Sequence, residues 1–146
     1  MSINMKWIKD DGGRAKAFPH LKLTKRIGDC TVRSIAIALE QNYKVTMTEL
    51  FSLGLELGCM PNTHECWREY LLQKGWSETK FGKQLVRINS NKIPRDQFVL
   101  CHMAGHLVAI NNNEIYDTWD SRTNSHGKPS RVFRYYTGNK SFNGLY

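Results

Sequence analysis

The fold is organised around one stretch, Arg26-Ile-Gly-Asp-Cys-Thr-Val-Arg-Ser-Ile-Ala-Ile-Ala-Leu39. A loop ends in Gly28, and apolar residues then recur at helical spacing: Val32, Ile35, Ala36 and Leu39. We expect Asp29 to be the N-cap of this helix, with its carboxylate accepting hydrogen bonds from backbone N–H groups one turn in. The helix is apolar enough to be buried, so the pattern predicts a core helix with Cys30 at its exposed tip.

Cys30 is therefore a candidate nucleophile. A thiol on the first helical residue lies at the positive end of the helix dipole, which favours the thiolate. Asp29 acts in the opposite direction, because a neighbouring anion raises the pKa of a thiol. The alternative is a packing cysteine, since cysteine is among the residue types most often buried.

The bulk composition predicts one globular domain in a reducing compartment. The 146 residues, of which 40% are hydrophobic, suit a single core. Four cysteines and an N-terminus without a signal-like apolar segment argue against a secreted disulfide scaffold. No apolar run approaches the length of a membrane span. We expect a cytoplasmic protein with no membrane contact.

The chain is basic, with a net charge of +8, and basic residues are spread along its whole length. This charge is compatible with an acidic partner or substrate, or with nucleic acid. A nucleic-acid-binding module would use the interleaved basic and aromatic residues near the C-terminus, namely Arg131, Arg134, Tyr135, Tyr136, Lys140 and Phe142. A solvated basic surface is the simpler explanation.

Three helices are predicted in the first half of the chain, after an N-terminal arm over residues 1–20. The first runs from Cys30 to about 41–42. The second begins at the capping-box pair Thr46 and Glu49 and ends at Gly58. The third is capped by Asn62 or Thr63 and ends at Gly75. In the second helix we expect an inward apolar stripe at Met47, Leu50, Phe51 and Leu57.

The second half of the chain changes to a strand pattern. Short β-rich runs separated by turn residues predict strands over 85–88, 97–103, 106–110, 114–119 and 131–136. Short links of this kind produce antiparallel meanders. Helices first and strands later indicate an α+β fold, with the helices on one face of an antiparallel sheet. The core would span residues 22–137, followed by a tail over 138–146.

His106 and Asp117 are predicted to meet in a hairpin. His106 opens one strand and Asp117 lies in the next, so a hairpin centred on Asn112 makes them direct or diagonal neighbours. A carboxylate there would fix one imidazole tautomer and stabilise its charged form. Trp119 shares the Asp117 face of the strand and would shield the pair. His102 is an alternate base, and Asp120 an alternate acid.

This order of elements resembles the papain-like cysteine peptidase superfamily, in particular its small bacterial and phage-type members such as the bacteriocin-leader peptidases. The matching segments are Gly28–Ala36 with its Asp-Cys pair, Phe98–Ile110 with its histidine, and Glu114–Trp119 with its acid. The resemblance implies that Cys30 is the nucleophile, His106 the general base and Asp117 the orienting acid. It implies a peptidase or amidase without a cofactor, of phage or mobile-element type, acting on a protein or peptide, which the basic charge suggests is acidic.

One family feature is missing. The superfamily usually carries a Gln five or six residues before the cysteine, whose amide joins the backbone N–H of the cysteine in the oxyanion hole. Here Thr24, Lys25 or Arg26 would have to supply that donor beside the Cys30 N–H. Losing one such donor typically costs about 10²–10³ in rate. The departure predicts a slow enzyme, a substituted donor, or an inactive domain used for binding.

A zinc site is the competing interpretation of the cysteines and histidines. The residues that would form it are Cys59, His64, Cys66, Cys101 and His102. The spacing of Cys59, His64 and Cys66 differs from that of zinc fingers, which pair their ligands on a knuckle. Residues two apart on a helix also point to different sides. We therefore predict no metal site.

Overall fold

The computed structural model describes residues 3–21 and 28–138. Its helices are α1 (Arg14–Ala17), α2 (Cys30–Ala38), α3 (Tyr43–Leu57) and α4 (His64–Gln73). The last three correspond to the predicted helices, and α1 is an additional single turn. Within the described residues, the helices are too short or too polar to cross a membrane.

A six-stranded sheet has the order β1-β6-β5-β4-β8-β2. Its strands are β1 (Lys6–Lys9), β2 (Trp76–Lys80), β4 (Val99–Met103), β5 (His106–Asn111), β6 (Glu114–Asp117) and β8 (Arg134–Gly138). A separate two-stranded sheet pairs β3 (Val86–Arg87) with β7 (Arg131–Val132). The α+β class is confirmed.

The prediction of a purely antiparallel sheet is wrong, because β1 pairs with β6 in parallel. Residues 6–9, which the sequence predicts to be part of an N-terminal arm, are thus an edge strand of the main sheet. The predicted strand over 131–136 is also interrupted. The Phe133 N–H donates to the carbonyl of His102 at 2.9 Å, outside the regular ladder, and β7 and β8 consequently belong to different sheets.

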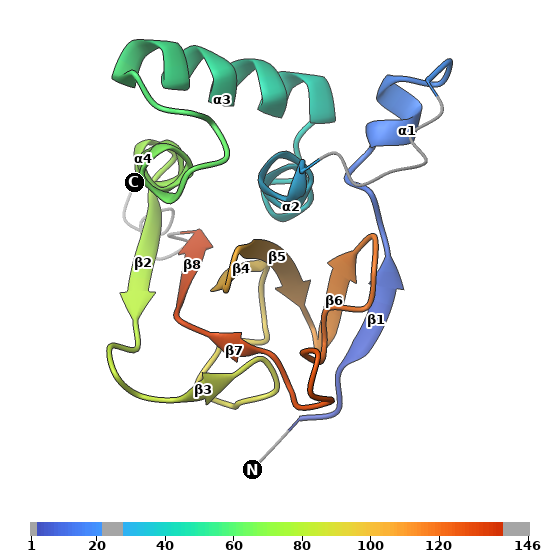
Figure 1. Ribbon diagram of the computed structural model, residues 1–146, viewed down its shortest axis with the longest axis vertical. Helices are drawn as coiled ribbons and strands as arrows, with labels where there is room; N and C mark the ends of the chain where they lie inside the picture. The colour runs from blue at the N-terminus through green and yellow to red at the C-terminus, as the bar shows by residue number, and fades with distance from the viewer. Residues whose placement is uncertain (1–2, 22–27, 139–146) are drawn as a thin grey trace.

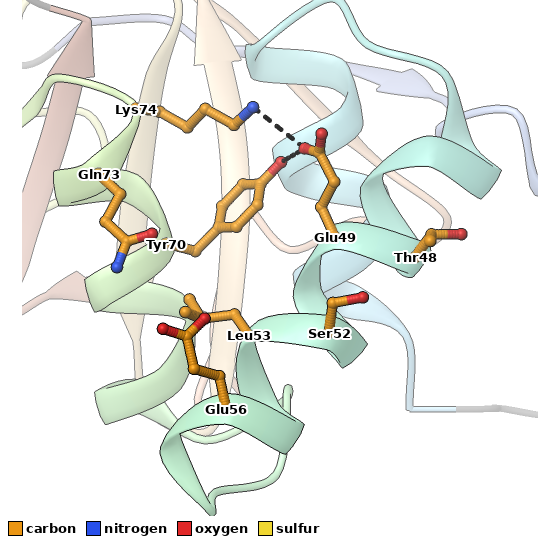
Figure 2. Close-up of a pocket in the computed structure, with 8 residues that line it drawn as sticks. All are labelled: Thr48, Glu49, Ser52, Leu53, Glu56, Tyr70, Gln73 and Lys74. Carbon is orange, nitrogen blue, oxygen red and sulfur yellow. Dashed lines mark hydrogen bonds and ion pairs between the residues drawn. The ribbon is translucent and has the colours of Figure 1, made fainter.

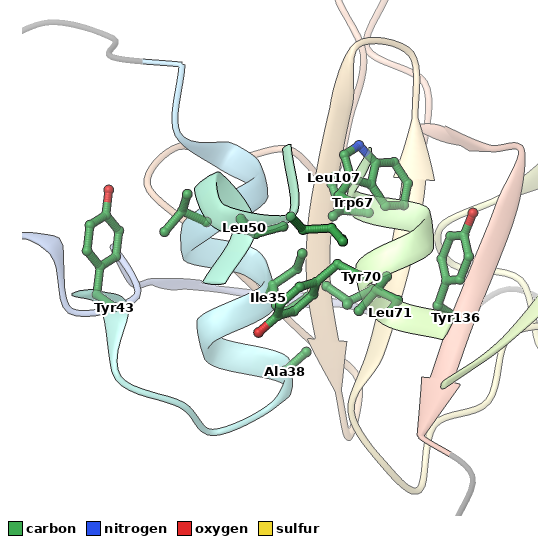
Figure 3. Packing of buried hydrophobic residues seen from close by; sticks show 13 residues of the cluster. Ile35, Ala38, Tyr43, Leu50, Trp67, Tyr70, Leu71, Leu107 and Tyr136 are labelled. Atoms are coloured by element: carbon green, nitrogen blue, oxygen red, sulfur yellow. The ribbon is translucent and has the colours of Figure 1, made fainter. Parts of the chain in front are cut away.

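The helices lie on one face of the main sheet (Figure 1). Helix α2 packs against β4, β5 and β6, whereas α3 lies farther out and contacts α2 and α4. The core between them is apolar and includes Ile35 and Leu50 from the helices and Leu107 and Tyr136 from the strands (Figure 3). Because side chains alternate along β5, Val108 and Ile110 enter a second core on the opposite face, which β3 and β7 help to cover.

Helix α3 differs from its predicted form at its start and on its outer face. Asn42 caps it by accepting from the Val45 N–H at 3.1 Å, whereas Thr46 is buried and donates to the Asn42 carbonyl. The predicted capping box is therefore wrong. Leu50 points inward as expected, but Phe51 and Leu57 are 52% and 47% exposed. The inward face uses Leu53 instead.

Candidate active site

Helix α2 presents Cys30 to the start of β5. Cys30 is the first residue of the helix and is half-buried. Its thiol interacts with the imidazole of His106 and with the backbone N–H of Leu107. The contact arises because α2 packs lengthwise on β5, whose first residue is His106. Two segments more than seventy residues apart in the sequence thus meet at one sulfur.

The β5–β6 hairpin brings His106 to Asp117. Its register pairs Ala109 with Tyr116, and continuing by one residue sets Asp117 opposite Val108. His106 is then a diagonal neighbour on the same face. Nε2 of His106 lies 2.6 Å from Oδ2 of Asp117, with the two side chains 10% and 2% exposed. Since Asp117 holds Nε2, Nδ1 is the ring nitrogen left for the thiol.

The Asp117 carboxylate has a partner for each oxygen besides the imidazole. Ser121 donates its hydroxyl to Oδ2 at 2.7 Å. Arg33 donates to Oδ1 at 2.9 Å, and the Thr118 N–H donates to the same oxygen at 2.8 Å. A buried carboxylate with this many donors is fixed in position and stays ionised. The pKa of Asp117 is lowered, because hydrogen bonds from His106, Ser121 and Arg33 outweigh the effect of burial.

Arg33 connects the two ends of the site. Its guanidinium bridges Asp117 to Asp29, with the Nη1–Oδ1 distance to Asp29 at 2.5 Å. Asp29 is also paired with Arg14 at 3.1 Å and accepts the Tyr43 hydroxyl at 2.8 Å. Asp29 is the N-cap residue of α2, as predicted, but within the described residues its side chain makes no capping hydrogen bond, so that part of the prediction is wrong. Its carboxylate is neutralised by arginine instead.

Arg33 and Ser121 were missed in the sequence, although Arg33 left a signal there. It is a basic residue in a helix that is otherwise apolar or small, four residues after Asp29. A charge in a buried helix requires a partner. That requirement identifies Asp29, whereas the second partner, Asp117, follows only from the tertiary fold.

The electrostatics favour a thiolate–imidazolium pair. Burial raises the pKa of Cys30, but the hydrogen bonds from His106 and Leu107 and the positive charges of His106 and Arg33 lower it further, so the net shift is downward. Burial lowers the pKa of His106, but the hydrogen bonds and charges of Asp117 and Cys30 raise it to about 9. At neutral pH both shifts favour the charged forms.

Trp119 lies against His106, with ring centroids 5.0 Å apart and planes inclined by 40°. The indole is 38% exposed, so it covers the imidazole from the solvent side. A tryptophan in this position restricts water around the imidazole–carboxylate hydrogen bond.

The two alternate site residues lie elsewhere. Asp120 forms an ion pair with Arg122 at 2.7 Å near the surface. His102 stacks on His64 with ring centroids 4.6 Å apart and meets Trp67 edge-on at 5.0 Å. Burial lowers the pKa of His102 to about 4, with help from His64 and Arg134. The structure therefore brings Asp117, and not Asp120, to His106.

The cysteines and histidines considered for zinc do not gather at one point. Cys59 interacts with Cys66, His64 contacts the Tyr136 hydroxyl at 2.9 Å and stacks on His102, and Cys101 is fully buried. Among the residues that the structure describes, no group of three or more His, Cys, Asp or Glu side chains is arranged to hold a metal ion.

The residues considered for oxyanion stabilisation and for nucleic-acid binding are only partly described. Thr24, Lys25 and Arg26 lie outside the described residues, as do Lys140 and Phe142. Tyr136 is fully buried, so its ring is not accessible for base stacking. Arg134 forms an ion pair with Glu78 at 3.7 Å, which partly neutralises its guanidinium.

Two of the hollows lined by described residues lie beside the helical layer. The larger, about 390 Å³, lies between α3 and α4 and is polar, with Glu49 held by Tyr70 and by Lys74 at 3.1 Å (Figure 2). It includes neither Cys30 nor His106 nor Asp117. The smaller, about 230 Å³, lies beside the tip of α2 and is lined by Asp29 and Thr31, the neighbours of Cys30.

Comparisons with protein-family models, with curated proteins and with solved structures gave no match.

Proposed function

We propose that this protein is a papain-like cysteine hydrolase that cleaves a peptide or amide bond through an acyl-enzyme. The observation that carries the proposal is the chain of contacts from the Cys30 thiol through the His106 imidazole to the buried Asp117 carboxylate. A nucleophile, a base and a group that orients the base are the components of a catalytic triad. Cys30, His106 and Asp117 take these roles in that order.

In the first half of the reaction, the Cys30 thiolate attacks the carbonyl carbon and forms a C–S bond. The proton on Nδ1 of His106 passes to the leaving nitrogen as the C–N bond breaks, which releases the amine and leaves a thioester on Sγ. Asp117 keeps Nε2 protonated and the ring in register, as its 2.6 Å contact requires.

In the second half, the neutral imidazole takes a proton from water, and the resulting hydroxide adds to the thioester. The C–S bond then breaks, the carboxylic acid leaves, and the thiolate–imidazolium pair is restored. Trp119 limits the water that reaches the imidazole from the solvent side.

The tip of α2 supports oxyanion stabilisation. The first backbone N–H groups of a helix have no intrahelical acceptor, and within the described residues the Asp29 side chain does not cap them. The Cys30 N–H therefore belongs to a set of donors at the positive end of the helix, beside the attacking sulfur. A second donor from Thr24, Lys25 or Arg26 remains part of the proposal.

Competitive alkylation tests the nucleophile directly. Iodoacetamide at pH 7 should modify Cys30 at least ~10-fold faster than Cys59, because a thiolate reacts and a thiol does not. Cys59 is the matched control, since it is also half-buried. His106→Ala should bring the Cys30 rate down to that of Cys59. Equal rates in the unmodified protein would overturn the assignment of Cys30.

Hydrolysis is tested with a fluorogenic peptide panel and the variants Cys30→Ala and Asp117→Asn. We expect turnover in the parent protein and loss of turnover in Cys30→Ala. Fast alkylation of Cys30 without turnover of any peptide would instead favour the second candidate function, an inactive papain-like binding module. The observation that favours this alternative is the sequence lacking the usual oxyanion Gln before Cys30.

A further inference from the structure

We propose that the two-stranded sheet of β3 and β7, with the turns that precede its two strands, is a docking surface for the phosphate backbone of duplex DNA. This surface lies on the side of the main sheet away from the helices, where β3 and β7 help to cover the second core (Figure 1). It is thus separate from the proposed hydrolase site at the tip of α2.

Two segments far apart in the sequence carry basic residues and no acids. Residues 80–95 hold five of the protein's 21 Lys and Arg, residues 121–134 hold four, and neither segment contains any of the 13 Asp and Glu. The β3–β7 pairing joins the two segments, with Arg87 opposite Arg131. The Ile88 N–H continues the contact by donating to the Ser130 carbonyl at 2.8 Å. The fold therefore concentrates positive charge on one side of the protein.

Most of these cations are not neutralised by the protein. Lys80, Arg122 and Arg134 form ion pairs with Glu78 or Asp120. The other six form no ion pair with any carboxylate in the described part of the chain: Lys83, Arg87, Lys92, Arg95, Lys128 and Arg131. Arg95 donates to the carbonyls of Ile88 and Ser90, which fixes it in the fold. The remaining cations are available to an anionic partner.

The Arg87–Arg131 pair is unfavourable for the fold by itself. Val86 and Val132 enter the second core, so Arg87 and Arg131 project from the other face of β3 and β7. Like charges directly opposite each other on neighbouring strands destabilise a sheet. Arg87 donates to the carbonyl of residue 129 at 2.6 Å, and Arg131 lies 5.1 Å from the centroid of a phenylalanine ring, but neither contact supplies a negative charge. An anion bound between the two guanidinium groups would offset their repulsion.

The turns before the two strands extend the surface in both directions. Lys83 precedes β3 and Lys128 precedes β7, and because the strands are antiparallel these lysines lie at opposite ends of the pair. Both lysines are exposed, as are Gln84 beside the first and Thr123 and Ser125 before the second. Lysine, arginine and small amide or hydroxyl side chains are the groups that contact phosphate oxygens in DNA complexes.

The surface suits a duplex better than a single strand, because single-strand binders stack bases on exposed aromatic rings. Here the Phe133 ring is covered by Arg131, and Phe81 and Tyr135 pack on each other with centroids 5.6 Å apart.

The surface also suits DNA better than an acidic protein, because the centre of a protein interface is usually apolar. Leu85, at 57%, is the one exposed large hydrophobic side chain in residues 80–95 and 121–134, all of which the structure describes. Contact through phosphates, without stacking or an apolar centre, is therefore the interaction that these residues favour.

Fluorescence anisotropy with a labelled DNA duplex of about 20 base pairs tests the surface. If Lys83, Arg87, Lys128 and Arg131 each contact one phosphate, the logarithm of the association constant should fall with the logarithm of the salt concentration with a slope of about −3.6. That slope weakens binding ~150-fold between about 50 and 200 mM salt. A slope near zero in the parent protein would overturn the proposal.

A pair of charge-matched double variants locates the binding. Lys83→Gln with Lys128→Gln should reduce the slope to about −1.8 and weaken binding at least ~10-fold at low salt. Lys16→Gln with Lys44→Gln removes the same charge from exposed positions in α1 and α3 and should change the affinity less than ~2-fold. Equal losses in the two double variants would mean that only net charge matters and would overturn the surface. Equal or tighter binding of single-stranded DNA or of polyglutamate would assign another partner and overturn the choice of duplex DNA.

Arg131→Glu separates binding from folding. It replaces the like-charged pair by an opposite-charged pair with Arg87, so the urea midpoint should equal or exceed that of the parent protein. The affinity for the duplex should nevertheless fall at least ~10-fold, because one phosphate contact is lost and a carboxylate is added. A lower urea midpoint would show that the two arginines do not repel each other, and unchanged affinity would show that DNA does not contact them; either result contradicts the proposal.

Discussion

Two histidine clusters, towards opposite edges of the same sheet, contain nearly the same groups. In one, His106 contacts Asp117 and stacks on Trp119, with centroids 5.0 Å apart. In the other, His64 faces Glu78 and stacks on Trp67 at 4.7 Å. Each cluster also includes a helix start, at Cys30 in α2 and at His64 in α4. The pKa of the histidine is nevertheless shifted in opposite directions in the two clusters.

The difference lies in where the arginines bind the carboxylate. Arg33 binds Oδ1 of Asp117, so Oδ2 remains 2.6 Å from His106. Arg68 occupies both oxygens of Glu78, at 2.9 Å and 3.1 Å, and His64 is left at 3.9 Å. Burial and the charge of Arg134 lower the pKa of His64, whereas the pKa of His106 is raised to about 9.

Under the proposed mechanism, a histidine beside a carboxylate is not sufficient. The mechanism also requires that the carboxylate keep one oxygen for the imidazole and that a nucleophile lie at the other ring nitrogen. Because the Tyr136 hydroxyl gives its single proton to Glu78, it accepts a hydrogen bond from Nε2 of His64. The cluster links α4 to Glu78 of β2 through Arg68 and to Tyr136 of β8 through His64, and we expect it to be structural.

Removing each histidine in turn is the most direct test of whether the two clusters have different roles. His106→Ala should reduce kcat/KM for peptide hydrolysis by about 10³–10⁴, as removal of a triad member does. His64→Ala should leave kcat/KM within about 2-fold, because no contact of His64 reaches Cys30. Steady-state kinetics with both variants measure this difference. Equal losses in the two variants would assign the first cluster a structural role as well.

The arginines of the two clusters should differ in how much they contribute to the free energy of unfolding. Arg33→Met leaves Asp29 and Asp117 buried without their shared cation, and we expect it to lower the free energy of unfolding by about 3–5 kcal/mol. Arg68→Met removes a guanidinium that is 37% exposed, and we expect a loss of ~1 kcal/mol or less. Urea denaturation of both variants provides the measurement. A small effect of Arg33→Met would show that the two aspartates find other partners.

The tryptophans of the two clusters should contribute to different properties, Trp67 to stability and Trp119 to activity. Trp67 is 3% exposed, so Trp67→Phe should lower the free energy of unfolding by about 1–2 kcal/mol through a cavity, with kcat/KM unchanged. Trp119 is 38% exposed, so Trp119→Phe should change stability by less than about 0.5 kcal/mol. It should lower kcat/KM severalfold, because the shielding of His106 is reduced. Thermal melts and kinetics on the same preparations distinguish the two outcomes.

The sequence was most informative where contacts are local. Helix α2 follows from its apolar spacing, and the β5–β6 hairpin is short enough for its register to be predicted to within one position. The meeting of His106 and Asp117 could therefore be predicted from that hairpin. The approach of Cys30 could not be derived from the pattern, because the packing of α2 on β5 is a long-range event. It was expected only through the family resemblance.

Other features are invisible in the sequence because tertiary context overrides local preference. The segments Lys6–Lys9 and Trp76–Lys80 are short and polar, and they become strands because β6 and β8 offer unpaired edges. The second bond of Arg33, to Asp117, likewise requires the folded chain. The exposed Phe51 looks like a core residue by its spacing, and its position at the hollow beside the tip of α2 appears only in three dimensions.

The smallest expected effect is a difference in how pH changes stability. The pKa of His106 is raised from 6.5 to about 9, so its contribution is complete below pH 6.5 and is lost as the pH rises through about 9. The pKa of His102, which stacks on His64, is lowered to about 4, so stability is lost as the pH falls from 6.5 towards 4. Urea denaturation should therefore show that His106→Gln flattens the alkaline limb and His102→Gln the acid limb, each by ~1.4 kcal/mol or less per pH unit. An alkaline limb that is unchanged in His106→Gln would contradict the charged pair at Cys30, because a neutral imidazole has no proton to lose in that range.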